Sequence, residues 1–437
     1  MTSSDASTQA PTAGSAPYPI GTRVNDLGHL EVGGCDVVEL ARQFGTPAYI
    51  YSEDDLRARV NAYIDGFDGR TDDFEVVYAS KAAPIGAILE LFREQGLSVD
   101  VASGGELHLA LWAGFDPERV YLHGNNKSGA ELRRALEVGV GHIVCDSLAE
   151  IAHLDRLCAS ADRRQDVLIR ITPAVEADTH SYVQTGQLDS KFGLGLADGL
   201  AAAAIDAVLS AANLRLVGLH AHIGSQIFEL EPYAHAIGAL AELAEPDWCQ
   251  LLNVGGGLAI AYTSHDSPPS IDDWVRATVD GIQGSFDPMP RILIEPGRSL
   301  VGNAGITAYT VGTVKEIPGV RTYVAVDGGM SDNLRPMLYG SRYEAIVADR
   351  AGASPDTMVA VAGMHCESSD VLVREVRLAA PRTGDVLVTP ATGAYGHAMA
   401  SNYNGVPRPP VVFCRDGDAR LVVRRETYED LAARDLR

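Results

Sequence analysis

Eight short β-branched runs alternate with helical patterns between residues 75 and 297. Segments such as IGAILELFREQG, GELHLALWAG, SGAELRRALEVG and LAEIAHLDRLCAS lie between the runs, with apolar residues at helical spacing and several terminal glycines. Eight alternations of strand and helix are typical of a (β/α)8 barrel. The runs are EVVYAS (75–80), LSVDVAS (97–103), RVYLHG (119–124), HIVCDS (142–147), DVLIRIT (166–172), LRLVGLHAHIG (214–224), QLLNVGGG (250–257) and RILIEPG (291–297).

Beyond about residue 300 the pattern changes to strands separated by turns. Helical spacing returns only in ETYEDLAARDL (426–436). We therefore expect an α/β protein in which an N-terminal (β/α)8 TIM-like barrel is followed by a C-terminal mainly β domain, a β-sandwich or β-barrel. The runs of this second part are GITAYTVGTVKEI (305–317), RTYVAVDGG (321–329), TMVAVAG (357–363), VLVREVRLA (371–379), DVLVTPA (385–391), PVVFCR (410–415) and ARLVVRRE (419–426).

The domain boundaries are expected from the same patterns. Residues 1–17 are rich in Ser, Thr, Ala and Pro, which indicates a disordered tail. The stretch HLEVGGCDVVELARQFGTPAYIYS (29–52) indicates a strand, a helix and a strand that could belong to either domain. We assign residues 18–45 to a segment that packs with the β domain. The barrel is then expected at residues 46–299, and the β domain at 300–437.

Composition excludes several classes of function. A formal net charge of −23 disfavours nucleic acid and anionic membrane surfaces as partners. No apolar run approaches the roughly 18 to 20 residues that span a bilayer, and the first residues lack the features of a signal peptide. We therefore expect a cytoplasmic protein. The six cysteines form no Cys-x-x-Cys pair, so neither a zinc site nor a disulfide framework is indicated.

Polar residues gather at the predicted carboxyl ends of the barrel strands. In a (β/α)8 barrel these ends meet at one mouth, where catalytic groups collect. Their convergence on a single mouth favours a functional site over eight unrelated structural roles. In chain order they are Lys81, Ser103 with Gly104 and Gly105, HGNNKS (123–128), Asp146, Arg170, HAHIGS (220–225), GGG (255–257) and EPGR (295–298).

Two of these segments have a specific chemistry. Lys81 ends an apolar run, so it either extends its head to water or is held where water is scarce and can form a Schiff base with an aldehyde. The Gly255–Gly257 triplet could present backbone N–H groups to a phosphate, although a tight turn explains it equally well.

Glu295 and Arg298 are the charged residues of the EPGR turn. The carboxylate of Glu295 could hold a protonated ring nitrogen, and the guanidinium of Arg298 could bind an anion; a surface ion pair is the alternative.

The two histidines of HAHIGS alternate along a strand and so face the same side. His220 and His222 could be metal ligands, but no carboxylate or cysteine stands at a familiar ligand spacing, and we expect no metal. A histidine here could instead stack on a flat cofactor, or simply be a structural residue. A lysine, a glycine phosphate cup, an acid for a pyridine nitrogen and a planar imidazole together match the needs of pyridoxal 5'-phosphate.

The chain resembles a known enzyme family in motifs that run in order from about residue 25 to the end. These motifs are VYASKA, HGNNKS, HAHIGSQIF, NVGGGL, EPGRSL, VDGGMSDNLRPMLYG, HCESSD and ATGAYGHAMASNYNG. Together they resemble the meso-diaminopimelate decarboxylases, pyridoxal-phosphate enzymes of the alanine-racemase-like fold type. The resemblance implies a homodimer with active sites at the interface, a small amino-acid substrate, and decarboxylation of meso-2,6-diaminopimelate to L-lysine as the last step of lysine biosynthesis.

The resemblance also implies roles for individual residues. Lys81 would be the Schiff-base lysine, His222 the imidazole that stacks on the cofactor ring, and Cys366 the proton donor offered across the dimer interface. Without the resemblance, Cys366 would be interpreted as a buried apolar residue. The implied cofactor contacts are Lys81, His222, Ser225, Gly257, Glu295, Gly297, Arg298 and Tyr395. The implied substrate contacts are Arg298, Arg335, Tyr339, Glu367 and Tyr395.

The charges of the substrate contacts agree with a substrate that has two amino-acid ends. Arg298 and Arg335 would bind carboxylates and Glu367 the distal ammonium. The alternatives are a decarboxylase of ornithine, arginine or carboxynorspermidine, a racemase, or a catalytically inactive binding homologue. Related decarboxylases of other diamino acids usually place an aspartate-bearing motif after the equivalent cysteine, whereas Glu367 follows Cys366 here. An inactive homologue would not need Lys81, Cys366 or Tyr395.

Overall fold

The computed structural model describes residues 15–173 and 190–436 and divides into two compact units. One unit comprises residues 59–259 and 268–297, and the other comprises residues up to 58, 260–267 and from 298 onward. Most of the predicted tail, residues 1–14, lies outside the described residues. Pro17, at its end, is ordered, because its carbonyl accepts a hydrogen bond from Asn303 Nδ2 at 3.0 Å. No described helix is long and apolar enough to cross a membrane.

The first unit is the predicted barrel. Within the described residues, eight parallel strands pair in the closed order β9-β11-β12-β13-β5-β6-β7-β8, with β8 returning to β9. All eight correspond to the apolar runs of the sequence, so the predicted barrel is confirmed. The strands are β5 (Phe74–Ala79), β6 (Ser98–Val101), β7 (Val120–Leu122), β8 (His142–Cys145), β9 (Gln165–Thr172), β11 (Leu214–Ala221), β12 (Leu251–Asn253) and β13 (Arg291–Ile294). A short strand, β10 (Leu194–Gly195), extends the sheet beside β9.

The interior of the barrel is filled by side chains from its strands. One buried cluster takes a residue from each of six strands, so this level of the barrel is a packed core and no pore. The cluster also explains why the strands read as nearly continuous apolar runs, since both faces of each strand are covered. Its members are Val77, Tyr121, Val144, Leu168, Val217 and Leu293.

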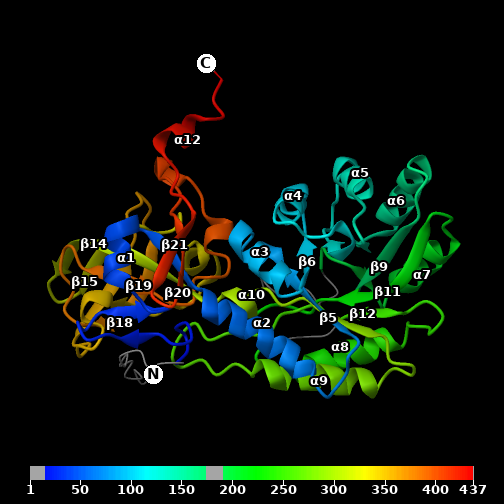
Figure 1. Ribbon diagram of the computed structural model, residues 1–437, viewed down its shortest axis with the longest axis horizontal. Helices are drawn as coiled ribbons and strands as arrows, with labels where there is room; N and C mark the ends of the chain where they lie inside the picture. The colour runs from blue at the N-terminus through cyan, green and yellow to red at the C-terminus, as the bar shows by residue number, and fades with distance from the viewer. Residues whose placement is uncertain (1–14, 174–189, 437) are drawn as a thin grey trace. The chain divides into compact units, whose positions relative to one another are not determined.

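Helices lie outside the barrel strands (Figure 1). Local signals in the sequence set their ends. The Ser128 hydroxyl and Glu131 carboxylate form a capping box at the start of one helix, and Gly139 ends it in the left-handed conformation at φ 81°. The barrel helices are α3 (Gly86–Glu94), α4 (Gly104–Trp112), α5 (Gly129–Val138), α6 (Leu148–Ser160), α7 (Leu200–Ser210), α8 (Glu231–Ala241) and α9 (Ile271–Gln283). Helix α2 (Glu53–Phe67) precedes them.

The second unit is mainly β, as predicted. Its larger sheet runs β18-β17-β15-β14-β4-β20-β21, with β19 beside β14 and β16 beside β19. A three-stranded sheet of β1 (Arg23–Val24), β2 (Leu30–Val32) and β3 (Cys35–Asp36) precedes α1 (Val37–Phe44). The remaining elements are β4 (Ala48–Ser52), α10 (Arg298–Val301), β14 (Gly305–Ile317), β15 (Arg321–Val326), α11 (Arg335–Tyr339), β16 (Ile346–Val347), β17 (Thr357–Ala362), β18 (Val371–Leu378), β19 (Val386–Thr389), β20 (Val411–Arg415), β21 (Asp418–Val423) and α12 (Tyr428–Ala432).

Strand β4 corrects the expected boundary at residue 46. It was placed in the barrel segment, but Ile50 pairs with Ile306 of β14 and with Val412 of β20. These three side chains are buried in one core cluster together with apolar residues of β2 and α1. The stretch 29–52, which could have belonged to either body, is therefore part of the β unit. Burial on both faces of β4 decides its place, and a local pattern cannot show which sheet covers it.

Candidate active site

Lys81 lies at the carboxyl end of β5, in the short 3-10 turn Ser80–Ala82. Ser80 and Ala82 are buried, whereas Lys81 is exposed. Of the two alternatives for Lys81, the structure shows the exposed one, and its role as the Schiff-base lysine stays a prediction. Its charge still acts at the mouth, since Lys81 helps to lower the pKa of His222.

His222 follows the last residue of β11 and is half-buried. Its Nδ1 accepts a hydrogen bond from the Gly256 amide at 3.2 Å, which leaves the other ring nitrogen to carry the proton. Burial and the neighbouring charge of Lys81 hold the pKa of His222 well below its usual value. His222 is therefore a neutral, oriented imidazole at the barrel mouth, which is the state that stacking on an aromatic ring requires.

The Gly255–Gly257 triplet follows β12 and packs closely on its neighbours. A Cβ added to Gly256 would lie 2.2 Å from the Glu295 carbonyl oxygen. Gly257 has a φ of 105°, and a Cβ there would lie 2.5 Å from the Gly224 carbonyl oxygen. Packing alone therefore requires glycine at these positions. The close packing also brings the half-buried Ser225, next in the chain after Gly224, to the same loop cluster.

Replacing Gly256 with alanine is expected to destabilise the barrel by about 1–3 kcal/mol, because the new methyl group meets backbone that cannot move aside. Gly238, inside α8, is the matched control, since a Cβ there has no atom within 4 Å. Gly238→Ala should leave stability unchanged or raise it by up to about 1 kcal/mol. Urea unfolding of both variants measures the difference. Equal stabilities would contradict the packing role of Gly256.

The turn that follows β13 lies against the strand that carries Lys81. The Ala79 amide donates to the Pro296 carbonyl at 3.1 Å, and a Cβ on Gly297 would lie 3.0 Å from Ala79 Cβ. Glu295, in this turn, is only 6% exposed. The structure therefore brings the predicted residues Lys81, Glu295 and Gly297 to neighbouring strand ends of one barrel.

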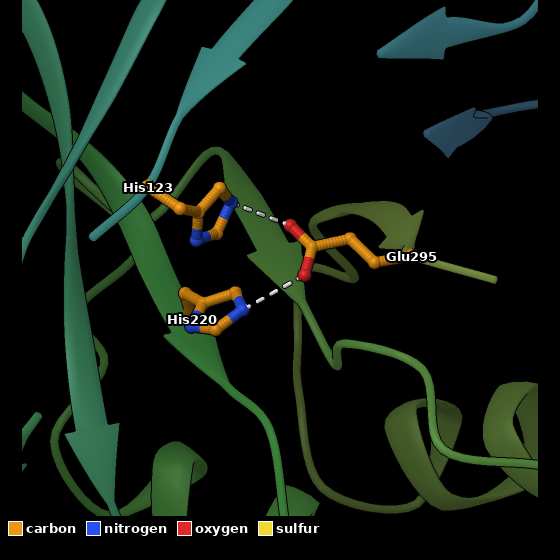
Figure 2. A group of neighbouring side chains, drawn as sticks. All are labelled: His123, His220 and Glu295. Atoms are coloured by element: carbon orange, nitrogen blue, oxygen red, sulfur yellow. Dashed lines mark hydrogen bonds and ion pairs between the residues drawn. The ribbon is translucent and has the colours of Figure 1, made fainter. Parts of the chain in front are cut away.

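The Glu295 carboxylate is held by two histidines and an asparagine. His123 Nε2 lies 2.8 Å from Oε1, and His220 Nε2 lies 3.0 Å from Oε2 (Figure 2). Asn253 Nδ2 donates to Oε1 at 2.7 Å. Burial would raise the pKa of Glu295, but His123 and His220 lower it further, so that it lies well below its usual value. The side chain is a buried carboxylate anion.

The two histidines and Glu295 also have the geometry of a possible metal site. The ligand atoms of His123, His220 and Glu295 lie within 4.8 Å of one another. The pair weighed from the sequence was His220 with His222; in the structure His220 instead faces Glu295, while His222 binds Gly256. Both carboxylate oxygens of Glu295 face hydrogen-bond donors, so hydrogen bonding accounts for the cluster.

Further charges lie near this anion. Asp100, in β6, is 3% exposed, and burial raises its pKa to about 6, although His123 acts in the opposite direction. Arg170 Nε lies 3.9 Å from Asp146 Oδ1, and the Arg170 guanidinium lies 4.5 Å from the centre of the Phe192 ring. The barrel mouth therefore combines buried acids and bases, as active sites commonly do.

A second cluster of predicted residues lies in the β unit. Arg298 and Arg335 are 7% and 5% exposed, and both donate hydrogen bonds to the hydroxyl of Tyr262. Arg335 also donates to Tyr343 at 3.1 Å. Within the described residues Arg335 has no carboxylate in ion-pairing distance, so its buried charge faces phenolic oxygens. Such a cation is suited to bind an anionic group.

Tyrosine rings surround this pair of guanidinium groups. The guanidinium of Arg335 lies 4.5 Å from the centre of the Tyr262 ring and 5.9 Å from that of Tyr339. The guanidinium of Arg298 lies 4.8 Å from the centre of the Tyr395 ring. Tyr395 adopts a φ of 59°, a conformation that is uncommon outside glycine and is often held at functional sites. The structure thus joins four predicted residues, Arg298, Arg335, Tyr339 and Tyr395.

Cys366 and Glu367 lie in the loop between β17 and β18, and both are exposed. All six cysteines are described, and Cys366 is the exposed one among them. Its amide donates to Asn404 Oδ1 at 3.3 Å, so a residue of the NYNG motif holds this loop. The exposure of Cys366 excludes the alternative of a buried apolar cysteine, and its role as proton donor stays a prediction.

Asp370 anchors the same loop. Its carboxylate accepts hydrogen bonds from the amides of Met330 at 2.8 Å and His365 at 2.9 Å. A Cβ on Gly363 would lie 2.1 Å from Asp370 Oδ2, so the carboxylate fills the space that this glycine leaves. Asp370 therefore ties the loop that carries Cys366 to the loop that follows β15.

Replacing Asp370 with asparagine is expected to destabilise the protein by about 1.5–3 kcal/mol, because one of the two backbone donors would then face an N–H group. The released loop should also change the rate at which the Cys366 thiol reacts with a disulfide reagent. Ser369→Ala, at the exposed neighbouring position, is the control. Thermal unfolding and thiol kinetics measure both effects. If the Cys366 thiol reacts at the same rate in Asp370→Asn and in Ser369→Ala, Asp370 does not anchor this loop.

Comparison with known proteins places the chain in a family. Residues 53–302 match the model of the pyridoxal-dependent decarboxylase pyridoxal-binding domain. The diaminopimelate decarboxylase of Bacillus subtilis is 48% identical over 95% of this chain and 97% of its own length. That of Halalkalibacterium halodurans is 46% identical with the same coverage of both chains. The chain belongs to the diaminopimelate decarboxylase family.

Solved structures agree with this membership. Diaminopimelate decarboxylase of M. jannaschii in complex with L-lysine has a TM-score of 0.89 and 33% identity, over 97% of this chain and 99% of that one. The Helicobacter pylori enzyme complexed with L-lysine has a TM-score of 0.84 and 31% identity, over 91% and 98%. A lysine/ornithine decarboxylase of Vibrio vulnificus, at 22% identity, shares the fold.

The two clusters also contain or adjoin residues that the sequence analysis did not single out. His123 opens the HGNNKS motif, and Asp100 is a charge inside an apolar strand, so both carried a signal. Asn253 carried a weaker one, as a polar residue before the glycine triplet. Tyr262 and Tyr343 carried none, because tyrosine is common in ordinary cores.

Proposed function

We propose that this protein catalyses the pyridoxal-phosphate-dependent decarboxylation of meso-2,6-diaminopimelate to L-lysine and carbon dioxide, the last step of lysine biosynthesis. The observation that carries the proposal is near full-length identity of 48% to a diaminopimelate decarboxylase. Four of the residues expected to bind substrate, Arg298, Arg335, Tyr339 and Tyr395, also lie in one cluster of the β unit, which supports the proposal. Membership of a carboxy-lyase family makes the protein an enzyme of this class.

The barrel residues are suited to hold pyridoxal 5'-phosphate. Lys81 supplies the amine that bonds to the aldehyde, His222 a neutral ring for stacking, and Glu295 an anion for the ring nitrogen. Gly257 and Gly297, with Ser225, line the loops nearby. The bound cofactor supplies a protonated ring that accepts electrons from the bond that breaks.

The residues of the β unit are suited to bind the substrate. Arg298 and Arg335 offer buried cations for carboxylates, while Tyr339 and Tyr395 present aromatic faces beside them. Glu367 offers an exposed carboxylate for the distal ammonium. The carbon that loses carbon dioxide must take up a proton, which Cys366 or the released Lys81 amine would donate.

A homodimer is part of the proposal, with Cys366 acting across the interface. Large apolar side chains are exposed beside this residue, which favours a covering partner. Met364 is 50% exposed, and Tyr403, which lies 5.5 Å from the His365 ring, is 42% exposed. Sedimentation velocity should give twice the mass of the chain. A monomer that retains full activity would contradict the shared site.

Product analysis tests the activity. Purified protein loaded with pyridoxal phosphate is incubated with meso-diaminopimelate, ornithine, arginine or carboxynorspermidine, and carbon dioxide and L-lysine are measured. Release of carbon dioxide from meso-diaminopimelate with an equal amount of L-lysine is expected. Preference for another diamino acid would overturn the substrate. No reaction with any of them would favour an inactive homologue.

A further inference from the structure

Three buried side chains from different strands meet at the carboxylate of Glu295, which is itself buried. His123 follows β7, His220 lies in β11 and Asn253 ends β12, while Glu295 follows β13. All four are at most 6% exposed. Figure 2 shows the two imidazole rings pointing toward the two oxygens of Glu295, and the strands that carry them are not neighbours in the barrel. Burial of so many polar groups costs free energy unless each group has a hydrogen-bond partner, so the arrangement needs an explanation.

The orientation of Asn253 follows from its second contact. Its Oδ1 accepts a hydrogen bond from the Gly255 amide at 2.9 Å, so Nδ2 must face Glu295, where it lies 2.7 Å from Oε1. Asn253 therefore acts as a donor to the carboxylate. It also links Glu295 to the first residue of the glycine triplet.

The protonation of His220 follows from its surroundings. Its Nε2 lies 3.0 Å from Glu295 Oε2, while Nδ1 is buried and has no hydrogen-bond partner among the described residues. A proton on Nδ1 would be a buried donor without an acceptor. Burial also lowers the pKa of His220 to about 4, despite the nearby Glu295. His220 is therefore neutral near pH 7 and donates through Nε2.

These donors have a consequence for the charge of Glu295. An ionised carboxylate can accept a hydrogen bond from every donor around it. A protonated carboxyl group would instead place its own hydrogen against the hydrogen of one of these donors. The ionised form is favoured by its hydrogen bonds, and neutral His220 does not cancel its charge. A full negative charge thus remains fixed at the barrel mouth, beside the strand end that carries Lys81.

We propose that His220, Asn253 and His123 are positioning residues, which keep Glu295 ionised and aimed so that it holds the proton on the pyridine nitrogen of the bound cofactor. This inference rests on the proposed function, since it needs pyridoxal phosphate at the mouth. The residues act through Glu295 and need not touch the substrate. Loss of a donor leaves the buried carboxylate poorly compensated, which favours its neutral form and weakens its hold on the ring proton.

The test measures the ring nitrogen directly. Protein is loaded with pyridoxal phosphate labelled with ¹⁵N in the ring, and the ¹⁵N chemical shift is followed from pH 6 to pH 10. In His220→Leu the nitrogen should lose its proton at least about one pH unit lower than in the unchanged protein. The cofactor dissociation constant should rise about 10-fold or more. His220→Gln, which can restore a side-chain N–H donor, should recover part of both effects.

A control variant separates this role from the loss of a half-buried imidazole elsewhere in the barrel. His142 lies at the first residue of β8 and stacks on Tyr121, with ring centres 4.5 Å apart. His142→Leu should leave the titration of the ring nitrogen unchanged, even if stability falls. Should His220→Leu fail to fold, Asn253→Leu, which removes the donor 2.7 Å from Oε1, should lower the titration of the ring nitrogen in the same direction.

The outcomes distinguish this inference from the proposed function. Protein that binds no pyridoxal phosphate overturns the proposed function, and the inference with it. If His220→Leu binds the cofactor and its ring nitrogen titrates as in the unchanged protein, the inference is overturned and the proposed function is not. Stoichiometric zinc in the purified protein that disappears in His220→Leu would also overturn it, because the cluster would then be a metal site. A lowered titration in His220→Leu, rescued in His220→Gln, supports it.

Discussion

Replacement of Lys81 with alanine is expected to reduce the decarboxylation of meso-diaminopimelate at least about 1,000-fold, since it removes both the amine that bonds to the aldehyde and a candidate proton donor. The absorption band of the covalently held cofactor should disappear as well. Lys81 is exposed in a turn between buried residues, so the substitution removes little packing. Folding should therefore be retained.

The control for Lys81→Ala is Lys315→Ala. Lys315 is exposed on β14 and is part of neither cluster. This variant should keep the activity and spectrum of the unchanged protein, which would show that the effect at position 81 is not a general effect of lost charge. Turnover and absorption spectra are measured on both. Wild-type-like activity of Lys81→Ala would refute the covalent role.

Replacement of Arg335 with methionine is expected to lower kcat/KM for meso-diaminopimelate about 100-fold. Truncating one partner of a buried, charge-assisted hydrogen bond costs about 2–5 kcal/mol, and 2.7 kcal/mol corresponds to roughly 100-fold. Methionine keeps most of the apolar stem that lies against Tyr262. Arg335→Lys keeps the charge but loses the planar fork, so an intermediate loss is expected. Steady-state kinetics with the substrate measure each variant.

Arg350 provides the matched control for Arg335. It is an arginine of the same unit, but it is paired with Asp385, at 3.0 Å and 2.6 Å. Arg350→Met should lower the melting temperature and leave kcat/KM nearly unchanged. An equal kinetic loss in both variants would indicate a structural role for Arg335. An unchanged kcat/KM in Arg335→Met would remove it from substrate binding.

The strands of both units were predictable because their signals are local. A run such as DVLIRIT is long, β-branched and bounded by polar residues, and a helix such as LAEIAHLDRLCAS begins at a serine cap. The positions of Lys81 and Glu295 followed in turn, since parallel strands bring their carboxyl ends to one mouth. Strand β4 shows the limit of such patterns: its residues indicate a strand, but they do not indicate which sheet it joins.

The contacts of Glu295 were not predictable in the same way. His220 and His222 lie two residues apart and were expected to face the same side of a strand. In the structure one of them faces a carboxylate 75 residues away, and the other faces a glycine amide. The exposure of Lys81 was one of two alternatives that the sequence left open, because a run of apolar neighbours does not say where a turn points the next side chain.

The sequence by itself determined the order of strands and helices, the two-part organisation and the residue types that suit pyridoxal phosphate and a diacid. These depend on neighbours along the chain and on periodicity. Only the tertiary structure decided that His123, His220 and Asn253 share one carboxylate, and that Tyr262 joins Arg298 with Arg335. Such contacts depend on closure of the barrel and on packing between distant segments, where burial makes each hydrogen bond matter far more than it would in water.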